Sequence, residues 1–278
     1  MKNLLRRLFY RLTPKGRIIV RRIIFWPLDL WERFIGKRDP LVPPRGMIYT
    51  GSGNFIEQGN RFREHFENFA GLHPGSRILD IGSGIGRMAV PLTQVLNPEI
   101  GGFYEGFDVV KAGVDWCNRQ INTRFPYFNF KYIPLKNDLY RGDGQQAEQF
   151  EFPYPDDHFD LVILTSVFTH MIPDEVEHYL NEISRVLGSG GKVFATFFIW
   201  DDDPSTTYSP SFAFPYDYGH YRLMDDKVKA ANVAYRKTWL SQKIENSGMK
   251  IHDELLGDWC KRLGVKSVDF QDILILTK

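Results

Sequence analysis

The sequence predicts an α/β fold in which helices cover both faces of a mostly parallel sheet. Apolar stretches of strand length alternate with longer stretches of helical periodicity along most of the 278-residue chain. A glycine-rich turn after the first of these strands is typical of a loop that binds a nucleotide. With 43% hydrophobic residues, the chain can fill the sizeable core that such a fold requires.

Seven stretches have the length and composition of strands. Helical patterns fill most of the intervals between them, which predicts a doubly wound sheet with its ligand at the carboxyl ends of the strands. The expected strands are 77–81, 102–108, 128–133, 159–165, 192–199, 250–256 and 269–277.

The N-terminal segment, residues 1–38, differs from the rest of the chain in charge. It holds eleven basic and two acidic residues, a net charge of +9, whereas the whole chain carries +1. Apolar residues recur at helical spacing between Leu4 and Leu12, opposite basic residues. The next stretch, RIIVRRIIFWPLDLW, has no apolar run near the roughly 18 residues of a membrane-spanning helix.

Three interpretations of this basic segment stay open. It can lie on an anionic membrane surface, where basic residues beside Leu, Phe and Trp suit lipid headgroups. It can instead pack its apolar side against the rest of the protein. A cleaved targeting peptide is the third, and the absence of Ser argues against it.

Prolines and glycines in GKRDPLVPPRG, residues 36–46, mark a boundary. Residues 1–45 are then a basic amphipathic extension, and residues 46–278 are the main domain. The two cysteines, Cys117 and Cys260, are too few for a disulfide framework and indicate a reducing, cytoplasmic setting. We expect a cytoplasmic protein, peripheral on the membrane if the extension binds lipid.

The glycine loop lies in the stretch RILDIGSGIGRMAV. A dinucleotide-binding fingerprint has glycines at offsets 0, 2 and 5, whereas Gly82, Gly84 and Gly86 stand at offsets 0, 2 and 4. Arg87 occupies the position of the third glycine of that fingerprint, which disfavours NAD. The absence of a Gly-Lys-Ser/Thr sequence excludes a P-loop.

The pattern Asp80-x-Gly82-x-Gly84-x-Gly86 resembles motif I of the class I S-adenosylmethionine (SAM) methyltransferases. Two further segments resemble this family in the right order. FYEGFDVV ends its strand in Asp108, and residues 152–198 resemble the region from the family's fourth strand to its fifth.

The resemblance implies a Rossmann-like, seven-stranded sheet of order 3-2-1-4-5-7-6, with the last strand antiparallel, and SAM as the cofactor. In the family, the first acid and the loop surround the amino-acid end of SAM, and the acid of the second strand holds the ribose. Pro134 stands where an acid near the adenine is often found, so either Asn137 or Asp138 replaces it or only backbone groups hold the adenine. The implied cofactor-binding residues are Asp80, Gly82, Ser83, Gly84, Gly86, Arg87, Asp108, Asn137, Asp138, Thr165 and Ser166.

Methyl transfer is an in-line displacement that needs alignment of the reactants and exclusion of water, and we expect no metal. A hydroxyl nucleophile also benefits from a general base. His170, just after the fourth strand, is the first candidate for the base or a substrate contact, although it can also merely support its loop. His220 is the second candidate.

Two segments are candidates for covering the site. Tyr49 and the stretch YTGSGNF precede the core and are expected on one side of it. Residues 200–224 are too long and too aromatic for a plain connector, so we interpret them as a substrate lid, with a self-packed surface lobe as the alternative. The expected lid residues are Trp200, Tyr216, Tyr218 and Tyr221.

We therefore expect a SAM-dependent methyltransferase (EC 2.1.1.-), directed to oxygen, of a small or lipid-linked, glycan-like substrate. The alternatives are a soluble N- or C-methyltransferase of a secondary metabolite and an inactive SAM-binding scaffold. Beyond residue 38 the chain is net acidic, and TSVF stands where amino-directed DNA methyltransferases have NPPY or DPPY. We expect no nucleic-acid partner.

Overall fold

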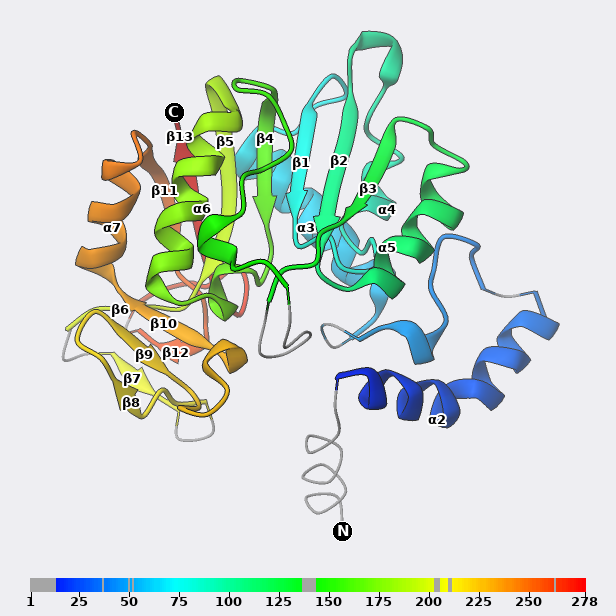
Figure 1. Ribbon diagram of the computed structural model, residues 1–278, viewed down its shortest axis with the longest axis horizontal. Coiled ribbons are helices and arrows are strands. Elements are labelled where there is room, and N and C mark those ends of the chain that lie inside the picture. The colour runs from blue at the N-terminus through cyan, green and yellow to red at the C-terminus, as the bar shows by residue number, and fades with distance from the viewer. Residues whose placement is uncertain are drawn as a thin grey trace.

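The computed structural model describes residues 14–36, 38–49, 51, 53–136, 144–202, 206–209, 212–262 and 264–278. A seven-stranded sheet of order β11-β13-β5-β4-β1-β2-β3 forms the centre of the molecule (Figure 1). Its strands are β1 (Arg77–Ile81), β2 (Phe103–Asp108), β3 (Phe128–Tyr132), β4 (Phe159–Leu164), β5 (Leu187–Phe197), β11 (Lys250–Leu255) and β13 (Asp272–Thr277).

The strand order confirms the Rossmann-like fold that the sequence predicts. Strands β1 to β5 pair in parallel, whereas β13 is antiparallel to both β5 and β11. Parallel strands place their carboxyl ends at one edge, which faces downward in Figure 1. The chain segments that leave β1, β2 and β4 therefore meet at this edge.

Helices cover both faces of the sheet. The longer ones are α2 (Pro14–Phe34), α3 (Phe55–Ala70), α6 (Pro173–Val186) and α7 (Lys237–Asn246), and the shorter ones are α4 (Ala89–Leu92) and α5 (Lys111–Cys117), which a π-helical turn (Asn118–Asn122) continues. Helices α6 and α7 pack on one face, and α3, α4 and α5 pack on the other. The sheet is thus buried on both sides, as expected for its apolar strands.

Helix α3 shows how local sequence sets these elements. The Asn54 side chain caps its start by accepting hydrogen bonds from two backbone N–H groups, and Gly71, with a φ of 72°, ends it. Phe66 lies on its inward face, with its ring centroid 4.8 Å from that of Phe194 on β5. This contact fixes α3 across the sheet, and the polar residues of its first turns reach the carboxyl edge.

Two strands begin three or more residues away from their predicted first residue. Strand β5 begins at Leu187 rather than 192, because the glycine-rich stretch after α6 is already extended and Leu187 pairs with Phe159 of β4. Strand β13 begins at Asp272 rather than 269, because residues 267–271 bend to line the cavity described below.

The segment between β5 and α7 folds as a small lobe with its own sheet of order β6-β10-β9-β8. Its strands have two to four residues, too short for the alternation that revealed the main sheet. They are β6 (Ile199–Trp200), β8 (Tyr216–Asp217), β9 (Tyr221–Leu223) and β10 (Val233–Arg236), and β7 (Thr207–Tyr208) pairs with β12 (Cys260–Lys261).

A buried carboxylate at the start of β13 ties this lobe to the main sheet. Asp272 is fully buried and accepts hydrogen bonds from the N–H of Ile199 (2.7 Å) and the indole N–H of Trp259 (2.7 Å). The Arg262 guanidinium lies 2.8 Å from it. Burial raises the pKa of Asp272, and Arg262 opposes that shift.

Helix α2 lies below the carboxyl edge of the sheet (Figure 1). The carboxylate of Asp29 accepts hydrogen bonds from the N–H groups of Arg45 (2.7 Å) and Gly46 (3.1 Å), and Glu32 pairs with the Arg45 side chain at 2.7 Å. These contacts hold α2 against the short helix η1 (Arg45–Met47). Among the described residues, no helix is both long enough and apolar enough to cross a bilayer.

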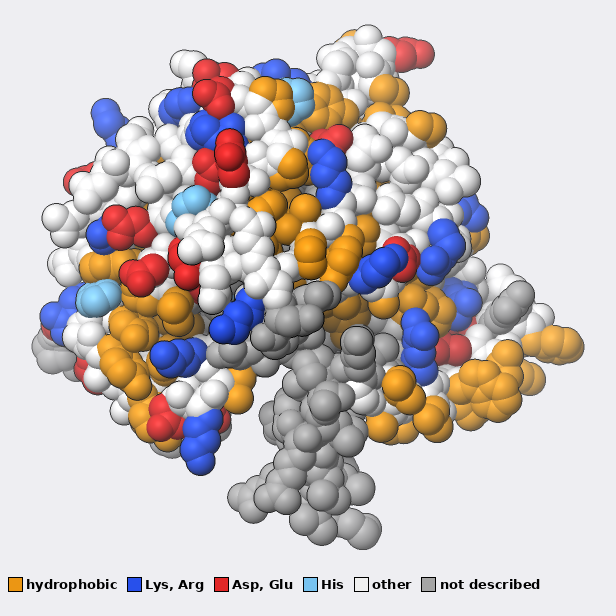
Figure 2. All heavy atoms as spheres, viewed as in Figure 1, with side chains coloured by type: hydrophobic (Ala, Val, Ile, Leu, Met, Phe, Trp, Pro, Cys, Tyr) orange, Lys and Arg blue, Asp and Glu red, His pale blue; other side chains and the backbone are white. Residues whose placement is uncertain are grey.

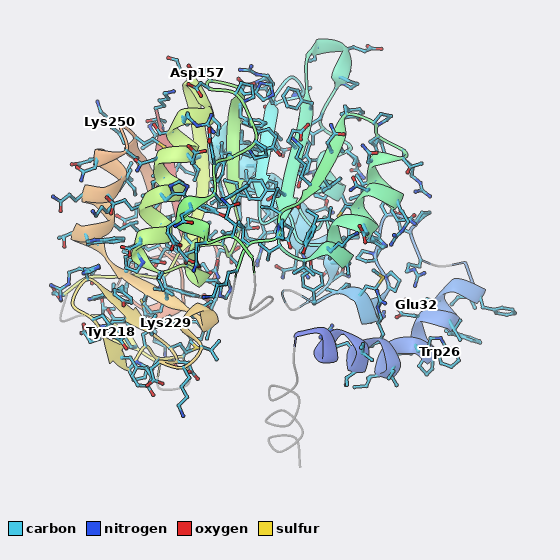
Figure 3. All side chains as sticks on the ribbon, in the orientation of Figure 1. Trp26, Glu32, Asp157, Tyr218, Lys229 and Lys250 are labelled. Carbon is cyan, nitrogen blue, oxygen red and sulfur yellow. The ribbon has the colours of Figure 1, made fainter. Side chains whose placement is uncertain are left out.

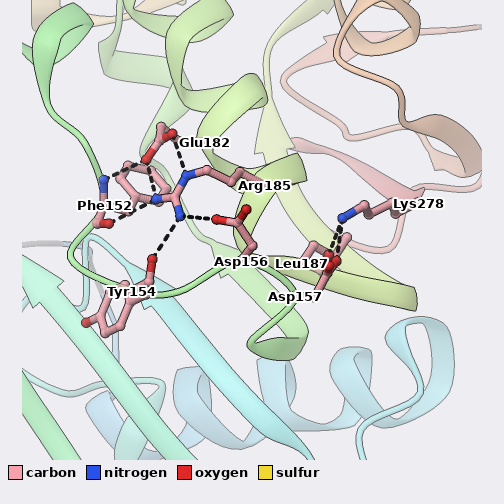
Figure 4. Close-up of polar contacts among 8 residues, drawn as sticks. All are labelled: Phe152, Tyr154, Asp156, Asp157, Glu182, Arg185, Leu187 and Lys278. Atoms are coloured by element: carbon pink, nitrogen blue, oxygen red, sulfur yellow. Dashed lines mark hydrogen bonds and ion pairs between the residues drawn. The ribbon is translucent and has the colours of Figure 1, made fainter.

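An arginine at the end of α6 holds the segment that leads into β4 (Figure 4). Arg185 pairs with Glu182 at 2.7 Å and Asp156 at 2.8 Å, and it donates to the carbonyls of Phe152 (3.0 Å) and Tyr154 (2.9 Å). Glu182 also accepts from the N–H of Phe152 (2.7 Å). The Glu182 hydrogen bond is the main cause of the raised pKa of Arg185.

We predict that Arg185→Met lowers the free energy of unfolding by about 2 kcal/mol, because Glu182 and two carbonyls lose a partly buried donor. Chemical denaturation measures the change. Arg124→Met is the matched control, because among the described residues the Arg124 side chain bonds only to exposed groups of Gln120. Equal stability of the Arg185 variant and the wild type would contradict the assigned role.

Candidate active site

A cavity of about 840 Å³ opens at the carboxyl edge of the sheet. Its inner wall is formed by residues that follow β1, β2 and β4, and its outer wall by α3, Tyr49, Gly51 and the segment before β13. The volume lies within the range of small-molecule sites. A cavity of this volume has room for a cofactor together with an acceptor.

The glycine loop forms the floor of this cavity. The N–H groups of Gly82 and Ser83 donate to the carbonyl of Phe107 (2.9 and 3.0 Å), which ties the loop to the end of β2. Gly82, Gly84 and Gly86 have φ angles of 76°, 59° and 81°, in the left-handed region that favours glycine. The loop's shape therefore depends on all three glycines.

Close packing adds a second reason for two of these glycines. A Cβ at Gly82 would lie 2.5 Å from the side chain of Val167, and one at Gly86 would lie 2.7 Å from that of Ile121. At these two positions a side chain would strike the protein itself, and this is a constraint that the loop sequence alone does not reveal.

Asp108 lies beside the loop at the end of β2. Its Oδ2 accepts from the N–H of Gly84 (2.8 Å) and its Oδ1 from the N–H of Val110 (2.7 Å). A carboxylate offers about four acceptor sites, so Asp108 keeps acceptor capacity for the hydroxyls of a ligand. Burial raises the pKa of Asp108 to about 6, and the backbone donors oppose this shift.

Asp80 lies behind the loop rather than in the cavity wall. It is fully buried and accepts a hydrogen bond from the Tyr104 hydroxyl, while its Oδ1 has no partner among the described residues. Burial raises its pKa to about 7, the Tyr104 bond lowers it and the charge of Asp108 raises it further. Neither Asp80 nor Gly86 lines the cavity, so direct contact of these two residues with a ligand stays a prediction.

The end of β4 contributes a strained residue. Ser166 has a φ of 59°, a conformation that costs a non-glycine residue roughly 1–3 kcal/mol. Its N–H donates to Thr196 Oγ1 (2.7 Å), and its hydroxyl donates to Gln271 Oε1 (3.0 Å). These bonds hold the strained turn, which aims Thr165 and Ser166 into the cavity.

His170 lines the same wall, at the end of the short helix η5 (Phe168–His170). Its Nδ1 lies 2.8 Å from the carbonyl oxygen of Ala230. Because a carbonyl only accepts, Nδ1 carries the proton, and the neutral ring keeps its lone pair on Nε2. Burial lowers the pKa of His170, and the backbone bonds to Ala230 and Ala231 oppose this shift.

The lobe sets the position of η5 from below. The hydroxyl of Tyr235, on β10, donates to the carbonyl of Phe168 (2.6 Å) and to that of Met171. Together with Ala230 of η6 (Lys229–Ala231), it holds the residues on both sides of His170. The insertion therefore supports the candidate base through Ala230 and Tyr235, two residues outside the expected lid.

The expected lid residues lie elsewhere. Trp200 is buried beneath Arg222, whose guanidinium lies 4.5 Å from the ring centroid, and Tyr218 stacks on Tyr221 at 4.9 Å. None of the four expected lid residues, including the exposed Tyr216, is among the described residues that line the cavity. The positions of these four residues fit the alternative of a self-packed surface lobe, and they do not fit a lid over this cavity.

His220 does not fit a catalytic role at this cavity either. It is exposed, stacks on Trp239 with a centroid distance of 5.2 Å and does not line the cavity. Asn137 and Asp138 lie outside the described residues, so their predicted contacts with the adenine stay predictions. The other predicted residues, Gly82, Ser83, Gly84, Arg87, Asp108, Thr165, Ser166 and His170, all line the cavity.

Sequence reasoning missed the polar outer wall. Arg61 of α3 pairs with Asp269 at 3.0 Å, and Gln58, Asp258 and Gln271 lie on the same wall. The helical spacing of residues 58 and 61 places them on one face of α3, so the sequence could have indicated a polar face on this helix. Nothing in the sequence shows that the segment before the last strand folds back to meet that face.

Comparison with known proteins agrees with this geometry. A family model described as a methyltransferase domain matches residues 79–195. The chain is 27% identical over 133 residues to the tRNA N(3)-cytidine methyltransferase METTL2 of Gallus gallus, a match that covers 48% of this chain and 33% of the relative. It is 26% identical over 160 residues to the 27-O-demethylrifamycin SV methyltransferase of Amycolatopsis mediterranei, covering 55% and 50%.

These matches span a third to a half of each relative's length. Among solved structures, the chain has a TM-score of 0.52 to a chain of the complex between the Haloferax volcanii Trm112 methyltransferase activator and a methyltransferase. That likeness, at 12% identity over 82% of this chain and 99% of the other, shows the fold. The chain carries a class I methyltransferase domain, and S-adenosylmethionine is its cofactor.

The residues present fit this cofactor. Asp108 has acceptor sites free for the ribose hydroxyls, and the left-handed glycine loop exposes backbone to the cavity. Two buried carboxylates with raised pKa values also favour a ligand that carries positive charge. The sulfonium and ammonium groups of SAM supply that charge.

We predict that Asp108→Asn weakens SAM binding by about 1.5–3 kcal/mol, because the amide replaces a charged acceptor of the ribose hydroxyls. Isothermal calorimetry with SAM and with S-adenosylhomocysteine measures the loss. Asp258→Asn, on the outer wall of the same cavity, is the matched control and should change the affinity little. Equal losses in the two variants would contradict the assignment of the ribose site.

The raised pKa values predict the pH dependence of the free protein's stability. The pKa values of Asp80 and Asp108 rise from the ordinary 3.8 to about 7 and about 6, so at a pH between 3.8 and the raised values the folded state binds more protons than the unfolded chain. Their contribution is fully present below about pH 4 and is lost as the pH rises through about 7. Denaturation from about pH 5 to about pH 8 should show a smaller decline for Asp80→Asn than for the wild type. An identical decline in the two proteins would contradict these pKa shifts.

Proposed function

We propose that the protein transfers the methyl group of SAM to a hydroxyl of a small or lipid-linked, glycan-like acceptor, with His170 as the general base. The observation that carries this proposal is the hydrogen bond from His170 Nδ1 to the carbonyl of Ala230, which leaves Nε2 as the basic atom of a residue that lines the cavity. When bound, SAM supplies a methyl group activated by a positively charged sulfur.

The protein's own residues supply position and a proton acceptor. Asp108 and the glycine loop hold the nucleoside end, and Ser166 and His170, which both follow β4, line the same cavity. The lowered pKa of His170, which burial causes, keeps the ring neutral near pH 7. A neutral imidazole can take the proton of a hydroxyl as that oxygen attacks.

Polar groups on the outer wall favour an acceptor with several hydroxyls. Gln58, Arg61, Asp258 and Gln271 offer both donors and acceptors opposite His170's wall. Such a mixture suits a glycan-like molecule, whose hydroxyls both donate and accept. The Amycolatopsis relative, named for O-demethylated rifamycin, supports an oxygen-directed reaction but does not identify the acceptor.

Other acceptors remain competing proposals. A soluble N- or C-methyltransferase of a secondary metabolite would use the same SAM site without needing His170 as a base. The relatives named for tRNA cytidine suggest a nucleic acid as the acceptor. The acidic residues Asp258 and Asp269 on the cavity wall disfavour this alternative, because they would repel a phosphate backbone. An inactive SAM-binding scaffold would bind SAM and release no S-adenosylhomocysteine.

We predict that His170→Ala lowers turnover by about 10²–10⁴-fold while the SAM affinity is retained. Release of S-adenosylhomocysteine is measured with glycan, lipid-extract and tRNA pools as acceptors, and mass spectrometry locates the methyl group. Because burial lowers the pKa of His170, the wild-type rate should fall only at a pH below the ordinary pKa of histidine, as the imidazole becomes protonated.

The matched control is His178→Ala, because His178 bonds through Nε2 to the carbonyl of Phe150 (2.8 Å) and does not line the cavity. Tyr235→Phe should reduce turnover less than His170→Ala, because it removes only the support of η5. Full turnover by His170→Ala would exclude this residue as the base, and a methyl group on nitrogen or carbon would exclude O-methylation.

A further inference from the structure

Helix α2 (Pro14–Phe34) exposes an apolar surface that the domain does not cover. Exposed Ile23, Trp26, Trp31 and Phe34 have 62–86% of their surface accessible, whereas large apolar residues of soluble proteins are mostly buried. Figure 3 shows Trp26 pointing away from the domain, and Figure 2 shows the hydrophobic side chains gathered along this lower edge. Among the side chains that the structure describes, the exposed large apolar residues here are Ile19, Ile23, Ile24, Trp26, Leu28, Leu30, Trp31, Phe34 and Ile35.

We propose that this apolar face of α2 docks on an anionic lipid bilayer and holds the cavity at the membrane surface. At 3.6 residues per turn, the outward side of the helix from Trp26 round to Ile24 spans an arc of roughly 160° without a charged residue. A helix with such an arc and polar flanks lies in the plane of the lipid interface. The two tryptophans within the arc suit the headgroup level of that interface.

Charge complementarity identifies the lipid as anionic. The two acidic residues of α2 face the domain, where Asp29 bonds to the backbone of residues 45 and 46 and lies 3.7 Å from Arg38, and Glu32 pairs with Arg45. Figure 3 shows Glu32 on the side of the helix opposite Trp26. The acids of the helix are thus withdrawn from the outward face, while Arg22 stays exposed beside it.

The basic residues of the chain concentrate in this region. Residues 1–38 carry a net charge of +9, and the remainder of the chain carries −8. Each cation near an anionic surface adds about 1 kcal/mol to binding. A segment of this charge favours an anionic bilayer over a second copy of the same helix, because two such helices would repel each other.

The attachment of α2 gives the docked molecule a defined orientation. A Cβ at Gly46 would lie 2.8 Å from the Cα of Arg22, so the backbone of η1 touches the helix directly. The chain then continues through Met47 and Ile48, which pack on the core, to Tyr49 and Gly51 in the cavity wall. Helix α2 and the carboxyl edge of the sheet lie on the same side of the molecule in Figure 1.

This orientation deepens the proposed function and rests on it. A membrane-docked cavity at this edge favours an amphiphilic acceptor, a glycan carried on a lipid chain, over a freely soluble one. The lobe adds exposed aromatic rings at this end of the molecule: Tyr216 and Tyr218, which are 40% and 47% exposed. Aromatic rings of this type are also suited to the headgroup region.

The test is co-sedimentation of the full chain with vesicles of phosphatidylcholine alone or with about one third phosphatidylglycerol. We expect binding to the anionic vesicles that weakens as salt is added, and much weaker binding to the neutral ones. Ile23→Glu should reduce partitioning at least about tenfold, because it places a charge at the centre of the apolar arc. Ile100→Glu is the matched control, because Ile100 is 62% exposed on the far end of the domain, against 68% for Ile23.

Each outcome is decisive for the docking surface. Equal partitioning of the wild type and Ile23→Glu would overturn the proposal, as would equal binding to neutral and anionic vesicles. A dimer in sedimentation equilibrium that Ile23→Glu dissociates, without vesicle binding, would assign the face to a second copy instead.

Calorimetry with SAM on the same preparations separates this proposal from the proposed function. A variant that binds SAM normally but not vesicles supports docking through α2 and shows that the domain is folded. If the wild type bound vesicles but did not bind SAM, the proposed function would be refuted and the docking surface would not. Equal methylation of soluble and lipid-linked glycans by vesicle-bound protein would remove the acceptor part of this inference and leave the docking intact.

Discussion

The site depends on the hydrogen bond between the N–H of Gly84 and the buried carboxylate of Asp108. This bond joins the loop after β1 to the end of β2, and the two N–H groups donated to Phe107 reinforce it. The loop can follow this path only because its three glycines adopt left-handed φ angles. This arrangement buries the Asp108 carboxylate, which raises its pKa. Hydrogen bonds donated by a ligand would stabilise the charged form of this carboxylate.

The other half of the site depends on the inserted lobe. The lobe is fastened to the sheet by Asp272, and its residues Ala230 and Tyr235 hold the short helix that ends in His170. The nucleoside end of the cavity is therefore set by the main sheet, and the candidate base is set by the lobe. This division allows the acceptor side to vary while the cofactor side is maintained, which is the common pattern of sites built on a widely used fold.

The sequence predicted the main sheet and the inner wall of the cavity because both depend on local patterns. Apolar alternation located the strands, and the glycine spacing with Asp108 located the cofactor loop. The outer wall depends on tertiary contacts between distant segments, such as that of Arg61 with Asp269, and no local pattern predicts these. The expected lid residues do not line the cavity for a related reason: the aromatic residues of the lobe fill its own interior and surface, and the strands that pair there are too short to be recognised in sequence.

We infer that the adenosyl group lies across the glycine loop with its ribose on Asp108. A crystal structure with S-adenosylhomocysteine tests this claim most directly. We predict ribose hydroxyls within hydrogen-bond distance of the Asp108 carboxylate and the sulfur beside the turn at Ser166, on the side of His170. A ligand bound elsewhere, or a ribose held by other groups while Asp108 keeps only its backbone donors, would contradict this placement.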